Sequence, residues 1–424
     1  MSLEAFWQNW LCLKSAKKSR PAPMNHLPDS RYSWTRLAAS IALATTGGIG
    51  LWAGVVVLPF IQADFHVDRA GASFPYTMTM LGFAFGGILS GKLADKFGIM
   101  IPMMISGVML CVGFFAAALA PNYWSYVAAS AVIIGALGSG TTFGPLVADV
   151  SLWFQKRRGI AVGIVASGNY LAGTIWPPLL TYLTEHYGWR SAFMFIGVVC
   201  VVIMVPLSLM LRERASLTER PSATAAQGTK GTNVLQAILI LAGLSCCVAM
   251  SMPQVHILAY CGDLGFDRAI GAQMLSVMLG FGVVSRLVSG YLSDHIGGIG
   301  TLIIGSFLQC LALLFYIPFN GLTSLYLVTA LFGLAQGGIV PSYALIVRDH
   351  FPAKEAGIRI STVLTSTVLG MALGGYLSGV IYDVTGSYKW AFLHGIAWNV
   401  LNMAIATWLL LRKRVKLTQH GLPA

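Results

Sequence analysis

GGILSGKLADKFG, residues 86–98, recurs 199 positions later as SRLVSGYLSDHIG, residues 285–297. The two copies share the pattern S-G-x-L-x-D-x-x-G, and each follows an apolar stretch long enough to begin a membrane-spanning helix. IGALGSGTTFGP (134–145) and FGLAQGGIVP (332–341) form a second, weaker match. The sequence therefore predicts two related halves, and duplicated halves are typical of transporters whose binding site lies between the repeats.

The composition indicates an integral membrane protein. Of the 424 residues, 56% are hydrophobic and only 10% are charged, whereas soluble domains carry about 25% charged residues. The formal net charge of +12 would suggest nucleic acid in a soluble protein. Here the basic residues lie in short connectors between apolar runs, so we assign them to membrane orientation and expect no nucleic-acid partner.

Twelve apolar segments have about the 20 residues that a spanning helix needs. They are 36–60, 73–93, 101–119, 125–149, 160–184, 191–211, 235–259, 270–292, 301–319, 325–347, 360–382 and 391–411. The predicted organisation is an N-terminal segment (1–35), a six-helix bundle (36–211), a polar central loop (212–234), a second six-helix bundle (235–411) and a tail (412–424).

The distribution of Lys and Arg predicts the orientation. With the N-terminus in the cytoplasm, 22 of the 27 basic residues lie in cytoplasmic segments and four lie outside. We therefore expect both termini in the cytoplasm. The stretch FWQNWLCL (6–13) is too short to span and makes a poor signal peptide. Met24 is an alternative to Met1 as the translation start, because nothing in residues 1–23 is needed by the predicted fold.

GKLADKFG and its repeat GYLSDHIG resemble the loop motif G-x-L-x-D-x-x-G of the major facilitator superfamily. The resemblance extends over essentially the whole chain from about residue 33, although His295 replaces the usual Arg or Lys of the second copy. It implies an all-α membrane fold of twelve transmembrane helices in two six-helix pseudo-repeat bundles, which works by alternating access. The implied gating residues are Gly91, Asp95, Gly98, Gly290, Asp294 and Gly297, and we add Asp149 to this network.

The stretch SLWFQKRRGIAVGIVASGNYLAG (151–173) is similar to the monocarboxylate and oxalate:formate branches, with W-F-x-x-R-R-G-x-A-x-G. In these branches an arginine of the eighth helix meets the substrate carboxylate, and Arg286 falls at the matching place. Mammalian-type monocarboxylate carriers have an aspartate one turn earlier, where this chain has Gly282. Oxalate carriers add a lysine in the eleventh helix, which segment 360–382 lacks. Some bacterial riboflavin permeases of the same superfamily also look similar to this chain, so an aromatic vitamin is an alternative substrate.

Arg36 and Lys92 lie at the cytoplasmic ends of their predicted spans, whereas Arg286 lies inside one. A charge near the centre of such a helix costs about 2.5–3.5 kcal/mol on insertion scales. The repeat places Gly87 at the equivalent position, so the fold itself does not need a cation there. The planar fork of arginine suits bidentate binding of a carboxylate. We favour binding of a substrate anion, with snorkelling of Arg286 to the headgroups as the alternative.

Other polar side chains at spanning depth are candidates for the cavity wall. We expect substrate contacts from Asn169, Tyr170, Gln254, Gln336 and Tyr343. His256 is the candidate for proton coupling, since histidine titrates near neutral pH. Proton symport, anion exchange and facilitated diffusion all stay open.

No phosphate-binding G-x-x-x-x-G-K-[ST] loop and no metal or catalytic motif occurs in the sequence. We therefore predict a protein that is not an enzyme and uses no cofactor or metal. It would be a secondary active or facilitative transporter, a multi-pass monomer of the cell inner membrane that moves a small organic solute. The lipid bilayer is a further partner, and a coupling proton is a candidate one. A monocarboxylate-like anion is favoured over a neutral aromatic nutrient such as riboflavin. A solute sensor that has lost transport is the alternative of another class.

Overall fold

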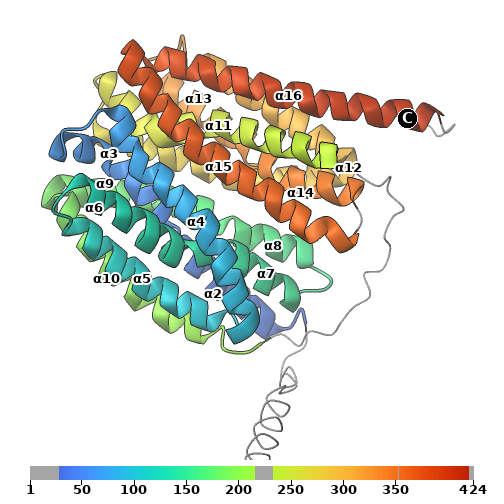
Figure 1. Cartoon of the computed structure of the whole chain (residues 1–424), viewed down its shortest axis with the longest axis horizontal. Helices are drawn as coiled ribbons and strands as arrows, with labels where there is room; N and C mark the ends of the chain where they lie inside the picture. Colours follow the sequence, from blue (N-terminus) through green and yellow to red (C-terminus); the bar gives the residue numbers. More distant parts are fainter. Residues whose placement is uncertain (1–27, 215–232, 352, 420–424) are drawn as a thin grey trace, which may run out of the picture.

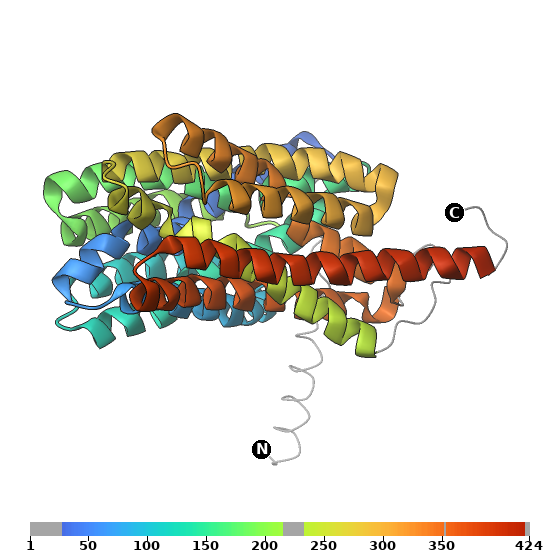
Figure 2. The same cartoon turned by 90° about the horizontal axis from the view of Figure 1, so that it is seen from above.

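The computed structural model describes residues 28–214, 233–351 and 353–419, and within these ranges the chain forms helices and no strand. Figure 1 shows long helices that lie roughly side by side, with α16 extending beyond the others, as Figure 2 shows from a second direction. Residues 1–27 and most of the predicted central loop lie outside the described ranges.

The first half of the chain forms α2 to α10. Its elements are α2 (Arg31–Gly47), α3 (Ile49–Asp64), α4 (Arg69–Phe97), α5 (Met100–Ala118), α6 (Tyr123–Ala128), η1 (Ala129–Gly138), η2 (Ser139–Thr141), α7 (Gly144–Trp153), α8 (Arg158–Ala166), α9 (Gly168–Tyr187) and α10 (Trp189–Leu209). The second half forms α11 to α16. Its elements are α11 (Asn233–Asp263), α12 (Arg268–Phe315), α13 (Leu322–Gln336), α14 (Ile339–His350), α15 (Ala353–Thr385) and α16 (Tyr388–Gln419).

Eleven helical stretches of the described residues are long and apolar enough to cross a membrane, against twelve predicted segments. The difference is the predicted segment 160–184. It forms the nine-residue α8 and the twenty-residue α9 on either side of Ser167. Other stretches are divided too and still count as one span, so what sets this one apart is the polar residues that α9 carries within its length. Large apolar side chains such as Val202, Leu327 and Phe195 are exposed, as expected for a surface that faces lipid.

Several spanning segments are broken where glycines bring two backbones close together. The tenth predicted segment forms α13 and α14 on either side of Gly337 and Gly338. A Cβ on Gly337 would lie 2.7 Å from the main-chain nitrogen of Arg286, a separation too short for any side chain. In the fourth segment, η1 is a π-helix. A Cβ on Gly86 of α4 would collide with the main-chain oxygen of Ala136 in η1. Such contacts let helices pack at backbone distance.

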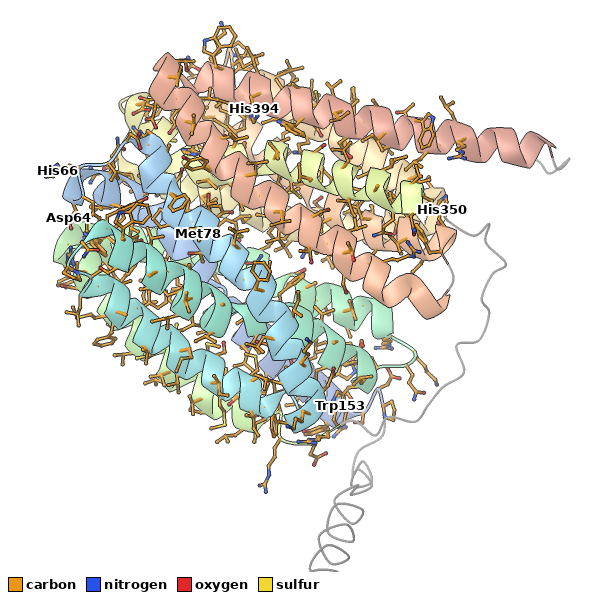
Figure 3. All side chains as sticks on the ribbon, in the orientation of Figure 1. Asp64, His66, Met78, Trp153, His350 and His394 are labelled. Atoms are coloured by element: carbon orange, nitrogen blue, oxygen red, sulfur yellow. The ribbon has the colours of Figure 1, made fainter. Side chains whose placement is uncertain are left out.

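The bundle has two ends, which α4 connects. Figure 3 shows Asp64 and His66 at one end, and Trp153 and His350 at the other. We call the first the Arg69 end, after the first residue of α4, and the second the Asp95 end, after the aspartate in its last turn.

The repeated motif ends both of its helices with a glycine that the backbone requires. Gly98 follows α4 with φ +80°, and Gly297 kinks α12 with φ +75°. Both values lie in the left-handed region, which residues with a Cβ rarely adopt. The last glycine of each G-x-L-x-D-x-x-G copy therefore turns the chain at the end of a spanning helix.

The two halves of the described chain pack together mainly where α4 meets α15 and α9 meets α12. α3 also contacts α11, and α8 contacts α12. The site described next lies where α9 meets α12.

Candidate functional site

Arg286 of α12 reaches across to the first half of the chain. Its Nη1 donates a hydrogen bond of 2.6 Å to the carbonyl oxygen of Ala166, and its Nε lies 3.4 Å from the carbonyl oxygen of Gly337. Ala166 is the last residue of α8, and Gly337 separates α13 from α14. Carbonyl groups at helix ends lack intrahelical partners and carry partial negative charge. The two helix breaks thus supply acceptors that attract the guanidinium.

No carboxylate pairs with Arg286 among the described residues. Its other neighbour is Tyr170 of α9, whose ring centroid lies 4.3 Å from the Arg286 Cζ atom. A cation over an aromatic face is stabilised by about 0.5–2 kcal/mol. The charge of Arg286 is therefore solvated by two carbonyls and a ring, but it is not neutralised.

Gly282 opens the space one helical turn before Arg286. A Cβ placed on Gly282 would lie 3.6 Å from the Gln336 Nε2 atom and 3.7 Å from two carbons of the Tyr170 ring. Gln336, Tyr170 and Gly282 thus surround one point close to the guanidinium. Because position 282 is a glycine, no carboxylate lies one turn before Arg286 on its own helix.

Three of the predicted polar residues have buried atoms without a partner. Gln254 of α11 donates from Nε2 to the Gln336 Oε1 atom at 2.6 Å, which leaves Gln254 Oε1 and Gln336 Nε2 without hydrogen bonds. The Asn169 Oδ1 atom is also unpartnered, while its main-chain oxygen accepts from Trp52 Nε1 at 3.1 Å. Buried polar atoms are nearly always satisfied by protein, water or ligand, so these atoms mark places where a polar solute or water fits.

Tyr343 and His256 do not join this cluster. The Tyr343 hydroxyl donates to Asn402 of α16 at 2.7 Å, inside the second half. His256 bonds the Tyr388 hydroxyl through Nδ1 at 3.0 Å and the Gly375 carbonyl oxygen through Nε2 at 2.8 Å. A carbonyl only accepts, so Nε2 carries a proton, and in a neutral ring Nδ1 accepts from Tyr388. His256 is thus held by two hydrogen bonds within the second half.

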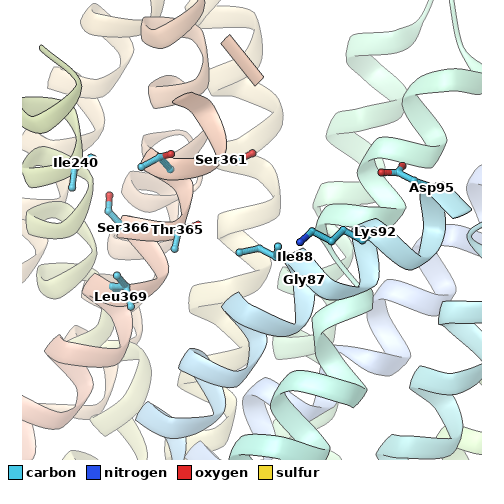
Figure 4. Close-up of a pocket in the computed structure, with 11 residues that line it drawn as sticks. Gly87, Ile88, Lys92, Asp95, Ile240, Ser361, Thr365, Ser366 and Leu369 are labelled. Carbon is cyan, nitrogen blue, oxygen red and sulfur yellow. The ribbon is translucent and has the colours of Figure 1, made fainter. Parts of the chain in front are cut away.

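A cavity of about 660 Å³ lies at the Asp95 end between α4 and α15. Figure 4 shows Lys92 and Asp95 of α4 on one side and Ser361 and Thr365 of α15 on the other. Asp95 is exposed, and its carboxylate is not hydrogen-bonded or ion-paired within the described part of the chain. A Cβ on Gly91, which lines this cavity, would meet no atom within 4 Å.

The second copy of the gating motif has the same open surroundings. A Cβ on Gly290 would also meet no atom within 4 Å. Asp294 lies in α12, but its side chain is outside the part that the structure describes. The gating roles stay predictions, and the structure adds that the first glycine of each copy faces open space.

Asp149, the further gating candidate, pairs within the first half. Its carboxylate accepts two hydrogen bonds from Arg36 of α2, at 3.0 Å from Nε and 2.9 Å from Nη2. The Arg36 side chain is 1% exposed and that of Asp149 12%, and the guanidinium lies 4.6 Å from the centroid of the Trp153 ring. This buried bidentate pair ties α2 to α7.

Asp29 holds the connector between α7 and α8, which follows this pair along the chain. Its carboxylate accepts from the main-chain nitrogens of Gln155 at 3.1 Å and Lys156 at 3.0 Å. The backbone hydrogen bond from Lys156 is the largest cause that lowers the pKa of Asp29, and the bond from Gln155 adds to it. The aspartate is therefore ionised at neutral pH and holds the basic connector in place.

A cluster at the Arg69 end was not predicted from the sequence. Asp383, in the last turn of α15, accepts hydrogen bonds from the main-chain nitrogens of Arg69 at 2.9 Å and Ala70 at 2.7 Å. The Arg69 side chain pairs with Asp263 of α11 at 2.7 Å. The sequence signal that could have indicated this cluster is an aspartate in the final turn of a spanning helix.

The family model described as Major Facilitator Superfamily matches residues 39–332 and 301–421. The chain belongs to the Major Facilitator Superfamily. It is accordingly a multi-pass membrane transporter for a small solute and not an enzyme, and its two halves are the two six-helix bundles of this superfamily.

Relatives within the superfamily are distant but cover most of the chain. Monocarboxylate transporter 13 of Bos taurus is 27% identical over 382 residues, 86% of each chain. The MFS-type transporter opdF of Penicillium oxalicum is 23% identical over 423 residues, 96% of each chain. A bacterial homologue of the human lysosomal transporter Spinster, solved in an inward-facing and unoccupied conformation, superposes with a TM-score of 0.71 at 14% identity, covering 92% of this chain and 98% of that one. The last comparison supports the fold alone.

Proposed function

We propose that this transporter moves a monocarboxylate-like organic anion by alternating access, with Arg286 binding the carboxylate. The observation that carries the proposal is that Arg286 lies between the two halves and has no acidic partner among the described residues. A carboxylate can replace the Ala166 carbonyl as an acceptor and form charged hydrogen bonds, which are about twice as strong as neutral ones. Tyr170 and Gln336 would contact the remainder of the solute.

The relatives add support of a weaker kind. The Bos taurus relative is named a monocarboxylate transporter, and its 27% identity leaves room for another substrate. Location in the cell inner membrane with both termini in the cytoplasm, and function as a monomer, belong to the same proposal. They rest on the distribution of basic residues and on the family resemblance.

The test is ligand-induced thermal stabilisation of the purified transporter. The panel holds short and aromatic monocarboxylates, dicarboxylates, and neutral flat vitamins that include riboflavin. A ligand at about 100 times its Kd should stabilise the folded state by about 2.7 kcal/mol. Arg286→Gln should weaken binding of the active carboxylate by about 30-fold or more, because a buried charge contact typically contributes about 2 kcal/mol or more.

Arg268→Gln is the matched control. Arg268 begins the same helix, and its guanidinium lies 4.7 Å from the centroid of the Phe60 ring, at the Arg69 end. This variant should bind the carboxylate as the wild type does. Stabilisation by a neutral ring alone, or an equal response of Arg286→Gln, would refute the anion proposal and favour the nutrient alternative. Counterflow of label in proteoliposomes then separates a transporter from a sensor, which binds without exchange.

We propose His256 as the site of a coupling proton. In the neutral ring the Nδ1 lone pair accepts from the Tyr388 hydroxyl, 3.0 Å away, so a second proton requires that hydroxyl to turn and accept instead. His256→Gln should abolish uptake driven by a pH gradient and leave counterflow intact. His394→Gln, in α16, is the control. Gradient-driven uptake by His256→Gln at the wild-type rate would assign coupling elsewhere or exclude it.

A further inference from the structure

The helices α4 and α15 are joined at one end and apart at the other. At the Arg69 end, a Cβ on Gly379 of α15 would lie 2.9 Å from the main-chain nitrogen of Ala70 in α4, so the two backbones touch. Further along, the Thr77 hydroxyl donates to the carbonyl oxygen of Ala372 at 3.0 Å. At the Asp95 end the same two helices line the cavity of about 660 Å³. The pair is therefore closed at one end of the bundle and open at the other.

Asp383 makes the closed end. The amides of Arg69 and Ala70 are the first two of α4, and the first four amides of a helix have no partner within it. Asp68, the N-cap of α4, accepts from the Gly71 nitrogen through its carboxylate at 2.7 Å and from the Ala72 nitrogen through its carbonyl oxygen at 2.9 Å. Asp383 accepts from both remaining amides and places a negative charge at the positive end of the helix dipole. One half of the protein thus caps a helix of the other half.

The Arg69 side chain strengthens the same contact. It pairs with Asp263 of α11 at 2.7 Å, and its Cζ lies 5.0 Å from the centroid of the Tyr382 ring in α15. The side chains of Arg69 and Asp263 are 12% and 29% exposed. A first turn of α4 held by two carboxylates from two helices of the opposite half cannot separate from them without losing charged hydrogen bonds.

We propose that Asp383 is a gate residue, which holds the Arg69 end closed while the Asp95 end is open. The arrangement is reciprocal. α4 carries Asp95 at its far end, facing α15 across the cavity, and α15 carries Asp383 at its own end, where it caps α4. In this structure the Asp383 contact is made, whereas Asp95 has no hydrogen bond or ion pair among the described residues. Transport requires the Asp383 contact to break when the opposite end closes.

The other half of the repeat shows that the fold does not impose this contact. Asp383 lies three residues before Gly386, which has φ +66°. Glu185 lies three residues before Gly188, with φ +79°, at the end of α9. Glu185 is exposed and makes no hydrogen bond or ion pair within the described residues. The first half thus has a carboxylate at the equivalent place that caps no helix among the described residues. Glu185 is therefore a matched control for Asp383.

The test is hydrogen–deuterium exchange of the full-length protein in lipid nanodiscs, comparing Asp383→Asn and Asp383→Ala with Glu185→Gln. Loss of the cap should speed exchange in the first turn of α4 by about fivefold or more. For a gate, peptides at the far end, around 361–369 and 87–95, should at the same time exchange more slowly, because closing that end covers the cavity. Glu185→Gln should change neither region.

The opposite response of the two ends separates a gate from a local cap. Faster exchange confined to residues 69–72, with the cavity peptides unchanged, would overturn the proposal, as would an unchanged first turn. Should Asp383→Ala fold poorly, Asp383→Asn keeps the size and one acceptor and still removes the charge. The readout does not depend on which solute is carried, so it can fail or succeed independently of the anion proposal.

Discussion

The guanidinium of Arg286 rests on the face of the Tyr170 ring, 4.3 Å from its centroid, and so a cation of the second half is stacked on an aromatic residue of the first. Tyr170→Leu removes the ring and should weaken binding of the active carboxylate by about 2- to 30-fold, the range of a cation–π contact. Tyr170→Phe keeps the ring and should stay within about threefold of the wild type. Calorimetric titration of both variants checks this, and an equal loss in both would assign the effect to the hydroxyl.

Gly282→Asp should weaken anion binding. It places a carboxylate one turn from Arg286, in a space where a Cβ fits at 3.6–3.7 Å from Gln336 and Tyr170. The new ion pair would neutralise the guanidinium that the substrate needs. Gly282→Ala is the control for size and should retain binding. The same calorimetric titration decides, and undiminished binding by Gly282→Asp would show that the free charge of Arg286 is not what attracts the solute.

The buried Arg36–Asp149 pair should be costly to break on one side. Asp149→Asn leaves the Arg36 charge buried and uncompensated, which typically destabilises by about 3–5 kcal/mol. The double variant Arg36→Met/Asp149→Leu removes both charges and should be closer to the wild type. Apparent melting temperatures in detergent measure both. Near-wild-type stability of Asp149→Asn would mean that water reaches the pair, and counterflow by the same variants tests the gating role predicted for Asp149.

Glycines of similar helical context should differ sharply in their tolerance of alanine. A Cβ on Gly86 would collide with the carbonyl oxygen of Ala136, whereas a Cβ on Gly54 of α3 meets no atom within 4 Å. Gly86→Ala should destabilise by about 1–3 kcal/mol through overpacking. Gly54→Ala should be neutral or stabilise by up to about 1 kcal/mol, because it reduces the freedom of the unfolded chain. Melting curves of the two variants provide the comparison, and equal melting temperatures would contradict it.

Much of the fold was predictable because apolar runs of spanning length and a repeated motif are properties of composition and spacing. The helix breaks were less so. The segment 160–184 was predicted as one span, and the structure divides it at Ser167. The partners of Arg286 could not be predicted at all, since they are main-chain carbonyls that only these breaks make available. Its position between the halves came from the family resemblance.

The orientation of His256 shows a second limit. Residues 245–261 of α11 are all buried, so this helix has no amphipathic pattern from which to infer which side faces the pathway. His256 and Gln254, two positions apart, point to different partners, and only Gln254 reaches the cluster around Arg286. Asp383 was missed for a related reason, because its partners are backbone amides of the other half, which no side-chain motif records.

The single helix α4 has a mechanical consequence. Its 29 residues span about 43 Å at 1.5 Å per residue, which matches the full thickness of a bilayer with its headgroups, about 40–45 Å. A rod of this length acts as a lever whose two tips lie at opposite membrane surfaces. When the helix turns as a rigid body, a displacement of its Arg69 end also displaces its Asp95 end, by an amount and in a direction set by the point about which it turns. No chain of intermediate contacts is needed to couple the two ends.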